Sequence, residues 1–206
     1  MFKRRSFFMS KTNKTRIMIE GTIVAALAFM LSLIPTTIGS SFTVSLGMIP
    51  MVLFALRRGV KPALLSAFIW GILHFPAGDV YFLSVIQVLI EYPIAFTFAG
   101  FAGVYAKKVQ QAILADDMQA ARKNIVYGTF VGTGAKFFWH FIAGVVFWGS
   151  YALWGMNPWI FSFVMNGASG LATAIVTAIV AVLVAEKVPQ LYLPKDGNLI
   201  QKRSHQ

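Results

Sequence analysis

The chain has 206 residues, of which 57% are hydrophobic and 12% are charged, and it contains no cysteine. Soluble domains are about 45–50% apolar and about 25% charged, so this composition, with a mean hydropathy of +0.69, indicates a membrane protein and excludes disulfides and thiolate metal sites. The formal net charge of +11 lies in blocks without an accompanying aromatic-basic motif, which favours a topology signal over a nucleic-acid-binding surface.

The placement of the positive charge predicts the orientation of the chain in the membrane. Apart from Lys136, Lys and Arg gather at residues 3–16, 57–61, 107–123 and 187–203, whereas segments 35–45, 76–80 and 151–158 contain neither. Cytoplasmic loops are enriched in Lys and Arg, so both termini are expected in the cytoplasm. A cleaved signal peptide is the alternative for the N-terminus, but its removal would leave an odd number of spans.

We therefore predict an all-α, multi-pass protein of the cell membrane. A basic N-terminal segment (residues 1–17) precedes a membrane domain of six transmembrane helices (18–187) and a cytoplasmic tail (188–206). The apolar segments are Met18–Pro35, Val44–Leu56, Pro62–Phe75, Val80–Ala106, Ile125–Leu153 and Trp159–Ala185. The second and third reach only about 20 Å, so they are expected to be tilted, irregular or sheltered by neighbours.

The parts outside these segments are predicted as follows. Residues 107–123 are expected to form a helical connection in the cytoplasm, and the chain after Pro189 is expected to be disordered or bound at the surface. No internal repeat is evident, which disfavours a fold built from inverted repeats.

The first helix carries a stripe of small residues on one face. Gly21, Ala25, Ala28 and Ser32 follow one another at spacings of three or four. Small side chains let two helices approach closely in lipid. The stripe therefore predicts either packing within this chain or docking to a separate membrane subunit, and a similar pair, Gly128 and Gly132, favours internal packing.

Glu91 is the only charged residue between Val80 and Ala106. An ionised carboxylate in hydrocarbon costs several kcal/mol or more, so such residues usually face a cavity and meet a partner or a ligand. The alternatives for Glu91 are a buried ion pair with Lys136 and direct contact with a ligand.

Polar residues on the fifth and sixth helices are expected at a similar depth. Lys136, His140, Gly144 and Trp148 recur every four residues and share one helix face. By helical rise, Glu91 and His140 both lie about 15 Å from the external side, and Asn166 about 12 Å. Three helices thus place polar groups near one level, although His140 could be a satisfied core histidine and Asn166 could cap a helix break or bridge two helices.

These residue types suit a positively charged aromatic heterocycle. A carboxylate binds a cation or an amine, an amide and an imidazole give directional hydrogen bonds, and aromatic rings stack. Tyr81, Tyr92 and Trp148 could supply the rings, whereas Trp154 and Trp159 are expected to belong to an interfacial belt. His74 is also expected at the interface, and metal binding by His74 and His140 lacks a spacing signal.

At these residues the chain resembles the thiamine-specific substrate-binding (S) components of energy-coupling factor transporters of bacteria. The resemblance covers most of the chain from Thr22 to Gly170, in the segments AALAFMLSLIP, SLGMIPMVLFALRRGVKPALLSAFIWGIL, GDVYFLSVIQVLIEYPIAF, AKFFWHFIAGVVFWGSYA and FSFVMNGAS. It implies a six-helix S-component fold with an outward-facing vitamin site, thiamine as the transported ligand, no cofactor, and a separate T subunit with two ATPases as partners.

The resemblance also implies residue roles. Glu91 would contact the charged or aminopyrimidine end of thiamine, and His140 and Asn166 would give hydrogen bonds. Trp148 would stack, Tyr81 and Tyr92 would line the pocket, Gly144 would leave room, and the stripe on the first helix would dock the T subunit. Two departures are notable: Phe161 stands where the family has a tyrosine, and residues 35–44 contain no tryptophan, so that Phe42 is the only aromatic residue available to close the site.

Three function classes follow from these observations. A binding and translocating subunit driven by partners is favoured, because the sequence has no Gly-rich loop followed by Lys and Ser or Thr that could bind ATP. The alternative is a self-sufficient secondary transporter that uses Glu91, Lys136 and His140 as coupling groups. A membrane enzyme with His140 and Glu91 as acid and base lacks a nucleophile or metal motif.

Overall fold

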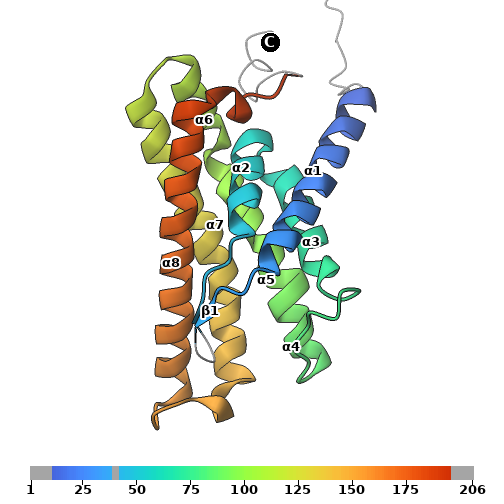
Figure 1. The fold of residues 1–206 in the computed structure, drawn as a ribbon, viewed down its shortest axis with the longest axis vertical. Coiled ribbons are helices and arrows are strands. Elements are labelled where there is room, and N and C mark those ends of the chain that lie inside the picture. Colours follow the sequence, from blue (N-terminus) through green and yellow to red (C-terminus); the bar gives the residue numbers. More distant parts are fainter. Residues whose placement is uncertain (1–10, 39–41, 196–206) are drawn as a thin grey trace, which may run out of the picture.

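The computed structural model describes residues 11–38 and 42–195, and this part of the chain is almost entirely helical. The start of α1 (Lys11–Ser32) and the end of α8 (Pro158–Lys187) lie at the same end of one elongated bundle (Figure 1). Three segments, residues 14–32, 85–114 and 158–187, are long and apolar enough to cross a bilayer. The predicted all-α membrane fold is confirmed.

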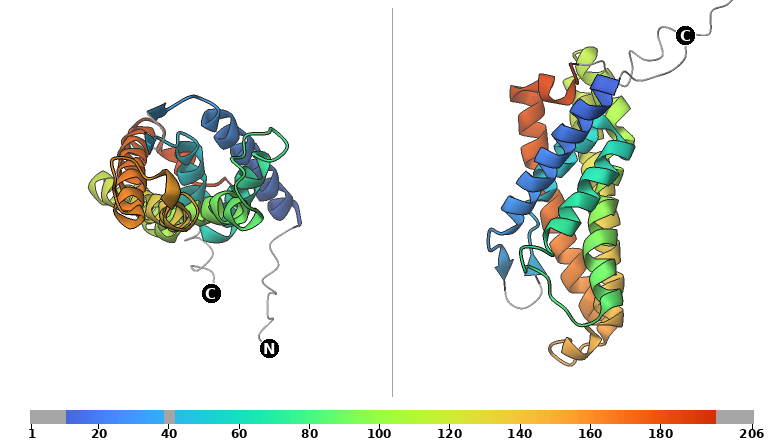
Figure 2. Two further views of the ribbon diagram at one scale, coloured as in Figure 1. Left: turned by 90° about the horizontal axis from the view of Figure 1, so that it is seen from below. Right: turned by 90° about the vertical axis from the view of Figure 1, so that its right-hand side faces the viewer.

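The other elements complete the six-helix arrangement, seen end-on in Figure 2. The remaining α-helices are α2 (Met48–Arg58), α3 (Val60–Leu73), α4 (Val85–Leu89), α5 (Ala95–Phe98), α6 (Ala106–Leu114) and α7 (Met118–Val146). A π-helical turn, η1 (Ile90–Ile94), and a 3-10 segment, η2 (Ala99–Tyr105), join α4, α5 and α6 into one span. Two short strands, β1 (Thr37–Ile38) and β2 (Phe42–Thr43), pair antiparallel, and η3 (Gly149–Tyr151) and η4 (Pro189–Tyr192) are short 3-10 turns.

The short α2 lies in the interior of the bundle. Its 11 residues reach only about 16 Å, roughly half the thickness of a hydrocarbon core. Met48, Met51, Val52, Ala55 and Leu56 are fully buried against neighbouring helices. The second span is thus short and sheltered by its neighbours, as predicted, and the third, α3, is short with 14 residues but exposes Leu65, Phe68 and Ile72 on one side.

Several helix ends differ from the predicted ones because loops bind to neighbouring helices. α2 begins at Met48 instead of Val44, since the backbone N–H groups of Thr43 and Ser45 donate to the hydroxyls of Ser169 (3.1 Å) and Thr173 (3.0 Å) on α8. The fifth span ends at Val146, and residues 147–157 form a loop with η3. The predicted helical connection over residues 107–123 is present as the ends of α6 and α7, which are separated by a tight turn at 115–117.

The small-residue stripe of α1 faces the inside of this chain. Ala25 and Ala28 are fully buried, the hydroxyl of Ser66 on α3 donates to the carbonyl of Gly21 (2.6 Å), and the indole N–H of Trp70 donates to Ser32 (3.1 Å). The docking role expected of Gly21, Ala25, Ala28 and Ser32 is therefore corrected: α2 and α3 already occupy that face, because small side chains let them approach α1. Gly128 and Gly132 also pack internally, as predicted, against Leu56 and the backbone of η2.

A polar cluster joins the helices at the end of the bundle that the positive-inside rule predicts to be cytoplasmic. Glu20 on α1 accepts hydrogen bonds from Arg57 (2.5 Å) and from Arg58 at the end of α2. Arg57 also donates to the carbonyls of Leu191 (2.8 Å) and Leu193 (3.0 Å). We call Glu20, Arg57 and Arg58, with the carbonyls that they bind, the cytoplasmic cluster.

The predicted disorder or surface attachment after Pro189 is wrong for residues 189–193. Tyr192 is fully buried, and its hydroxyl donates to the carbonyl of Ala181 (2.6 Å). Burial raises the pKa of Tyr192, so its hydroxyl remains a proton donor at physiological pH. Residues 196–206 of the predicted tail lie outside the described part of the chain.

Candidate functional site

A π-helical turn presents Glu91 to the interior of the bundle. Pro93 lies within this turn and has no backbone N–H to donate, so a regular helical hydrogen bond is missing there. Such turns are rare and occur often at functional sites. The turn places the carboxylate of Glu91 between α4 and α7, where the indole N–H of Trp148 donates to Oε1 (2.6 Å) and the amide of Gln87 donates to Oε2.

Gln87 fixes both Glu91 and the loop before α4. Its Oε1 accepts from the backbone N–H of Leu83 (3.0 Å), and its amide also donates to the carbonyl of Tyr81 (3.0 Å). Tyr92 holds the same loop, because its hydroxyl oxygen accepts from the backbone N–H of Tyr81 (2.9 Å). Sequence reasoning missed Gln87, although its position four residues before Glu91 places both on one helix face.

Lys136 and His140 form a second polar group on α7. Lys136 Nζ lies 3.1 Å from His140 Nε2 and 4.4 Å from the ring centre of Phe96, and only 4% of Lys136 is exposed. Among the described residues, Lys136 and Glu91 do not approach within ion-pair distance, so the Glu91–Lys136 pair that the sequence allowed does not form in this structure. Beyond His140, Lys136 faces the rings of Phe96 and Phe137 (4.4 and 4.7 Å to the ring centres), and aromatic faces stabilise a cation.

The third polar group lies on α8 and depends on Gly144 of α7. The amide of Asn166 donates to the hydroxyl of Ser162 (3.1 Å), which donates in turn to the carbonyl of Phe141 (2.7 Å). A Cβ at Gly144 would lie 2.3 Å from Ser162 Oγ, so only glycine permits this approach of α7 and α8. α8 is continuous through Asn166, which therefore does not cap a helix break.

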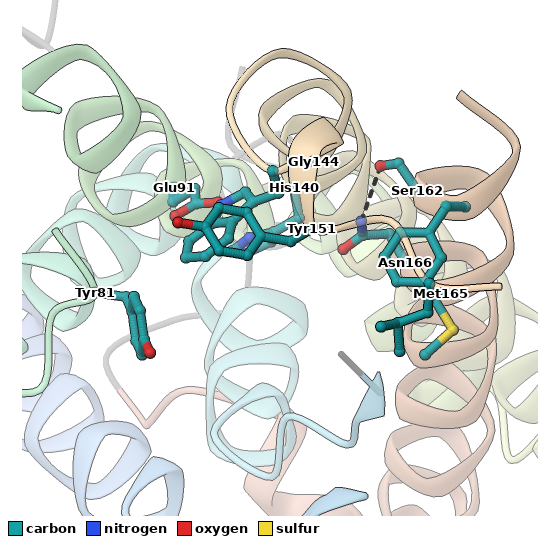
Figure 3. A pocket seen from close by; sticks show the side chains of 11 residues that line it. Tyr81, Glu91, His140, Gly144, Tyr151, Ser162, Met165 and Asn166 are labelled. Atoms are coloured by element: carbon teal, nitrogen blue, oxygen red, sulfur yellow. Dashed lines mark hydrogen bonds between the residues drawn. The ribbon is translucent and has the colours of Figure 1, made fainter. Parts of the chain in front are cut away.

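These groups surround two adjoining cavities. The outer cavity, of about 620 Å³, is lined by Tyr81, Glu91, His140, Gly144, Trp148, Tyr151, Leu153, Phe161, Ser162, Met165 and Asn166. Figure 3 shows Tyr81 and Glu91 on one side of it and Ser162, Met165 and Asn166, from α8, on the other. The inner cavity, of about 350 Å³, shares Glu91, His140 and Asn166 and adds Tyr92 and Lys136. All eight residues expected to bind a ligand thus line one cavity or the other, and the volumes suit a small molecule.

Aromatic rings form one wall of the outer cavity. The ring of Trp148 lies 5.4 Å from that of Tyr81 and 5.6 Å from that of Tyr151. Trp154 and Trp159 do not line either cavity, and 73% of Trp154 is exposed, which agrees with an interfacial position. Flat aromatic faces next to a carboxylate can bind a cationic or heteroaromatic ligand.

His74 is not at the interface as predicted, but buried beside the inner cavity. Its Nδ1 lies 2.8 Å from the carboxylate of Asp79, and its ring packs edge-on against Phe29 and Phe96. His74 is 4% exposed, because residues 74–79 turn back over the end of α3. Its Nε2 has no hydrogen-bond partner within the described residues.

The inner cavity is rich in hydroxyl groups. Thr36, Thr37, Thr43, Ser45 and Ser169 contribute to its lining, and most of them come from the first external loop. Sequence reasoning missed these residues, because their positions in an irregular loop have no periodic pattern. Within residues 11–38 and 42–195, no group of His, Asp and Glu side chains has the arrangement of a metal site.

The chain is similar to known thiamine transporters in both sequence and fold. Residues 18–193 match the family model described as thiamine transporter protein (Thia_YuaJ). The thiamine transporter ThiT of Lacticaseibacillus paracasei is 39% identical over 92% of this chain and 96% of that protein, and the ThiT of Bacillus subtilis is 28% identical over 89% and 97%. A solved structure of ThiT from Listeria monocytogenes, 43% identical, superposes with a TM-score of 0.87 over 88% of this chain and 100% of that one.

Proposed function

Because the chain belongs to the thiamine transporter family, whose model matches residues 18–193, we propose that it is the binding subunit of a vitamin uptake transporter and holds thiamine in the outer and inner cavities. The family is one of transporters and not of enzymes, and the apolar helices make this chain a membrane protein. Thiamine joins a cationic thiazolium ring to an aminopyrimidine.

The observation that carries this proposal is the carboxylate of Glu91 beside an aromatic wall. Glu91 is held by neutral donors, Gln87 and Trp148, and has no contact ion pair with Lys136. Its negative charge is thus available to a cationic ligand or to the amino group of the pyrimidine. Trp148, Tyr81 and Tyr151 offer ring faces, and Asn166 and His140 offer hydrogen bonds from the opposite side.

The cavities also suggest how the ligand is oriented. The ring systems of thiamine fit the aromatic outer cavity, and its hydroxyethyl arm fits the hydroxyl-rich inner cavity. The shared residues Glu91, His140 and Asn166 would then lie beside the middle of the ligand. The site faces the external side, because it lies at the end of the bundle away from the basic loops.

Ligand titration of the purified protein, followed by tryptophan fluorescence, tests this assignment. Thiamine is expected to quench with submicromolar affinity or better, and Glu91→Gln and His140→Ala are each expected to weaken binding at least about tenfold, or about 1.4 kcal/mol. Glu186→Gln is the matched control, since Glu186 pairs with Arg122 (2.8 Å) at the cytoplasmic end. Full binding by both cavity variants, or none by the intact protein, contradicts the assignment.

Energy for uptake is proposed to come from a separate T subunit and two ABC-type ATPases. The sequence has no ATP-binding loop, so uptake driven by ATP hydrolysis depends on a partner that binds ATP. Since the small-residue stripe is covered, we place the docking surface on the opposite face of α1, where Ile19, Ile23, Ala26 and Met30 are exposed. Ala26→Trp is expected to abolish co-purification with the T subunit while thiamine binding is kept.

A self-sufficient secondary transporter is the alternative function. Vesicles that contain only this protein separate the two hypotheses. Thiamine accumulation driven by a proton gradient, without ATPases, would overturn the proposed dependence on partners.

A further inference from the structure

A narrow apolar groove runs between α1 and α3 near the cytoplasmic end. Its volume is about 310 Å³, and it is lined by Lys14, Ile17, Met18, Gly21, Thr22, Lys61, Pro62, Leu65, Ser66 and Ile69. Ser66 closes the floor by donating to the carbonyl of Gly21 (2.6 Å). The groove is separate from the two ligand cavities and shares no residue with them.

Two lysines stand at the cytoplasmic mouth of this groove. Lys14 lies in the first described turn of α1 and Lys61 in the first turn of α3. Neither lysine has an acidic partner in the part of the chain that the structure describes. Glu20, the acid nearest in sequence to Lys14, is bound by Arg57 and Arg58 and does not neutralise this mouth.

The dimensions match a phospholipid. From Lys14 to Gly21 the groove extends about 10 Å along α1, and from Lys61 to Ile69 about 12 Å along α3. The positive-inside rule assigns the lysines to the cytoplasmic surface, where lipid phosphates lie, and the apolar lining runs from them toward the middle of the span. Basic pockets between transmembrane helices on the cytoplasmic side recognise anionic headgroups.

We propose that this groove binds one anionic phospholipid, with its phosphate on Lys14 and Lys61 and one acyl chain along the floor between α1 and α3. A volume of about 310 Å³ over about 10 Å gives a mean cross-section of about 30 Å². A single hydrocarbon chain fits within this cross-section, whereas a helix about 10 Å wide would cover the groove from outside without filling it.

Photo-crosslinking from the exposed edge of the groove tests which molecule occupies it. Leu65 is 51% exposed, and because the chain has no cysteine, a single Leu65→Cys can carry a photoreactive probe. In vesicles of equal phosphatidylglycerol and phosphatidylcholine, mass spectrometry should show phosphatidylglycerol adducts at least about threefold enriched at this site. The control is Leu183→Cys, on the exposed side of α8, where the two lipids should be captured equally.

The lysines supply the second arm of the test. Lys14→Gln with Lys61→Gln should remove the enrichment at position 65, whereas Lys123→Gln with Lys187→Gln removes the same charge at other cytoplasmic helix ends and should keep it. Thiamine binding should be unchanged in both pairs, which shows that the variants are folded. Absence of enrichment, enrichment that survives in the groove variant, or adducts chiefly with a second copy or another protein would overturn the proposal.

Discussion

Glu91 shows which features of the candidate site can be predicted from the sequence and which cannot. Its isolation in an apolar span predicted a buried functional carboxylate, and its depth predicted His140 and Asn166 nearby. The donors that hold it, Gln87 and Trp148, depend on how a π turn rotates the side chain. The spacing of residues in the sequence does not reveal that rotation, so it left open a pair with Lys136 that does not form in this structure.

Gly144 gives the sharpest prediction at this scale. In Gly144→Ala the methyl group would lie 2.3 Å from Ser162 Oγ and 3.0 Å from Asn166 Nδ2, so both side chains must leave their present positions or α7 and α8 must separate. We expect thiamine affinity to fall at least about tenfold in a fluorescence titration. Gly134→Ala, also on α7 but with no atom within 4 Å of its Cβ position, should bind normally. Equal affinities for the two variants would contradict this role of Gly144.

Replacement of Phe161 by tyrosine is expected to strengthen thiamine binding. It lines the outer cavity where the family resemblance places a tyrosine, so Phe161→Tyr adds a hydroxyl beside the ligand. A hydrogen bond contributes about 0.5–1.5 kcal/mol, and we expect affinity to rise about two- to tenfold. Phe163→Tyr, at an exposed position on α8, is the matched control. Weaker binding by the Phe161 variant would show that the cavity does not accommodate the hydroxyl.

At the scale of elements, the fourth span shows why helix prediction is incomplete. The apolar run over residues 80–106 correctly predicted a spanning segment, but the structure divides it into α4, η1, α5 and η2. Pro93 marks the irregularity in sequence, whereas the choice of a π turn depends on packing against α3 and α7. The conformation of the loop between α1 and α2 could not be predicted from the sequence either. Its backbone is held by hydroxyl groups of α8, which is distant in the sequence.

A substitution at Gln87 tests whether its hydrogen bonds hold the loop before α4 in place. In Gln87→Ala, Leu83 and Tyr81 lose their side-chain hydrogen bonds and Glu91 loses one donor. Amide hydrogen exchange over residues 81–84 should become at least about tenfold faster, with weaker thiamine binding. Gln111→Ala, on the exposed side of α6, should change neither quantity. Unaltered exchange would mean that Tyr92 alone holds the loop.

In the molecule as a whole, contacts form between segments that are distant in the sequence. The positive-inside pattern predicted that the termini share one end, but not that Arg57 ties α1 and α2 to residues 191–193. Basic residues that were interpreted only as a topology signal therefore also have a structural role. Long-range pairing of this kind leaves no periodic trace in the sequence.

The cytoplasmic cluster should be a major source of stability. In Glu20→Gln the carboxylate that Arg57 and Arg58 share is lost, and Arg58 is almost fully buried. We expect a destabilisation of about 1–3 kcal/mol, measured as a lower Tm in detergent. Glu186→Gln removes the more exposed pair with Arg122 and should change stability by less than about 1 kcal/mol. Similar losses in the two variants would contradict this ranking.

The position of the cavities has a consequence for stoichiometry. Between them and the cytoplasmic cluster lies a packed core in which Met51, Val52 and Ala55 of α2 are fully buried. A ligand that enters from outside therefore has no path onward through this conformation. Under the proposed dependence on partners, the isolated protein should act as a saturable sink that retains one thiamine per chain, and it should show no sustained turnover.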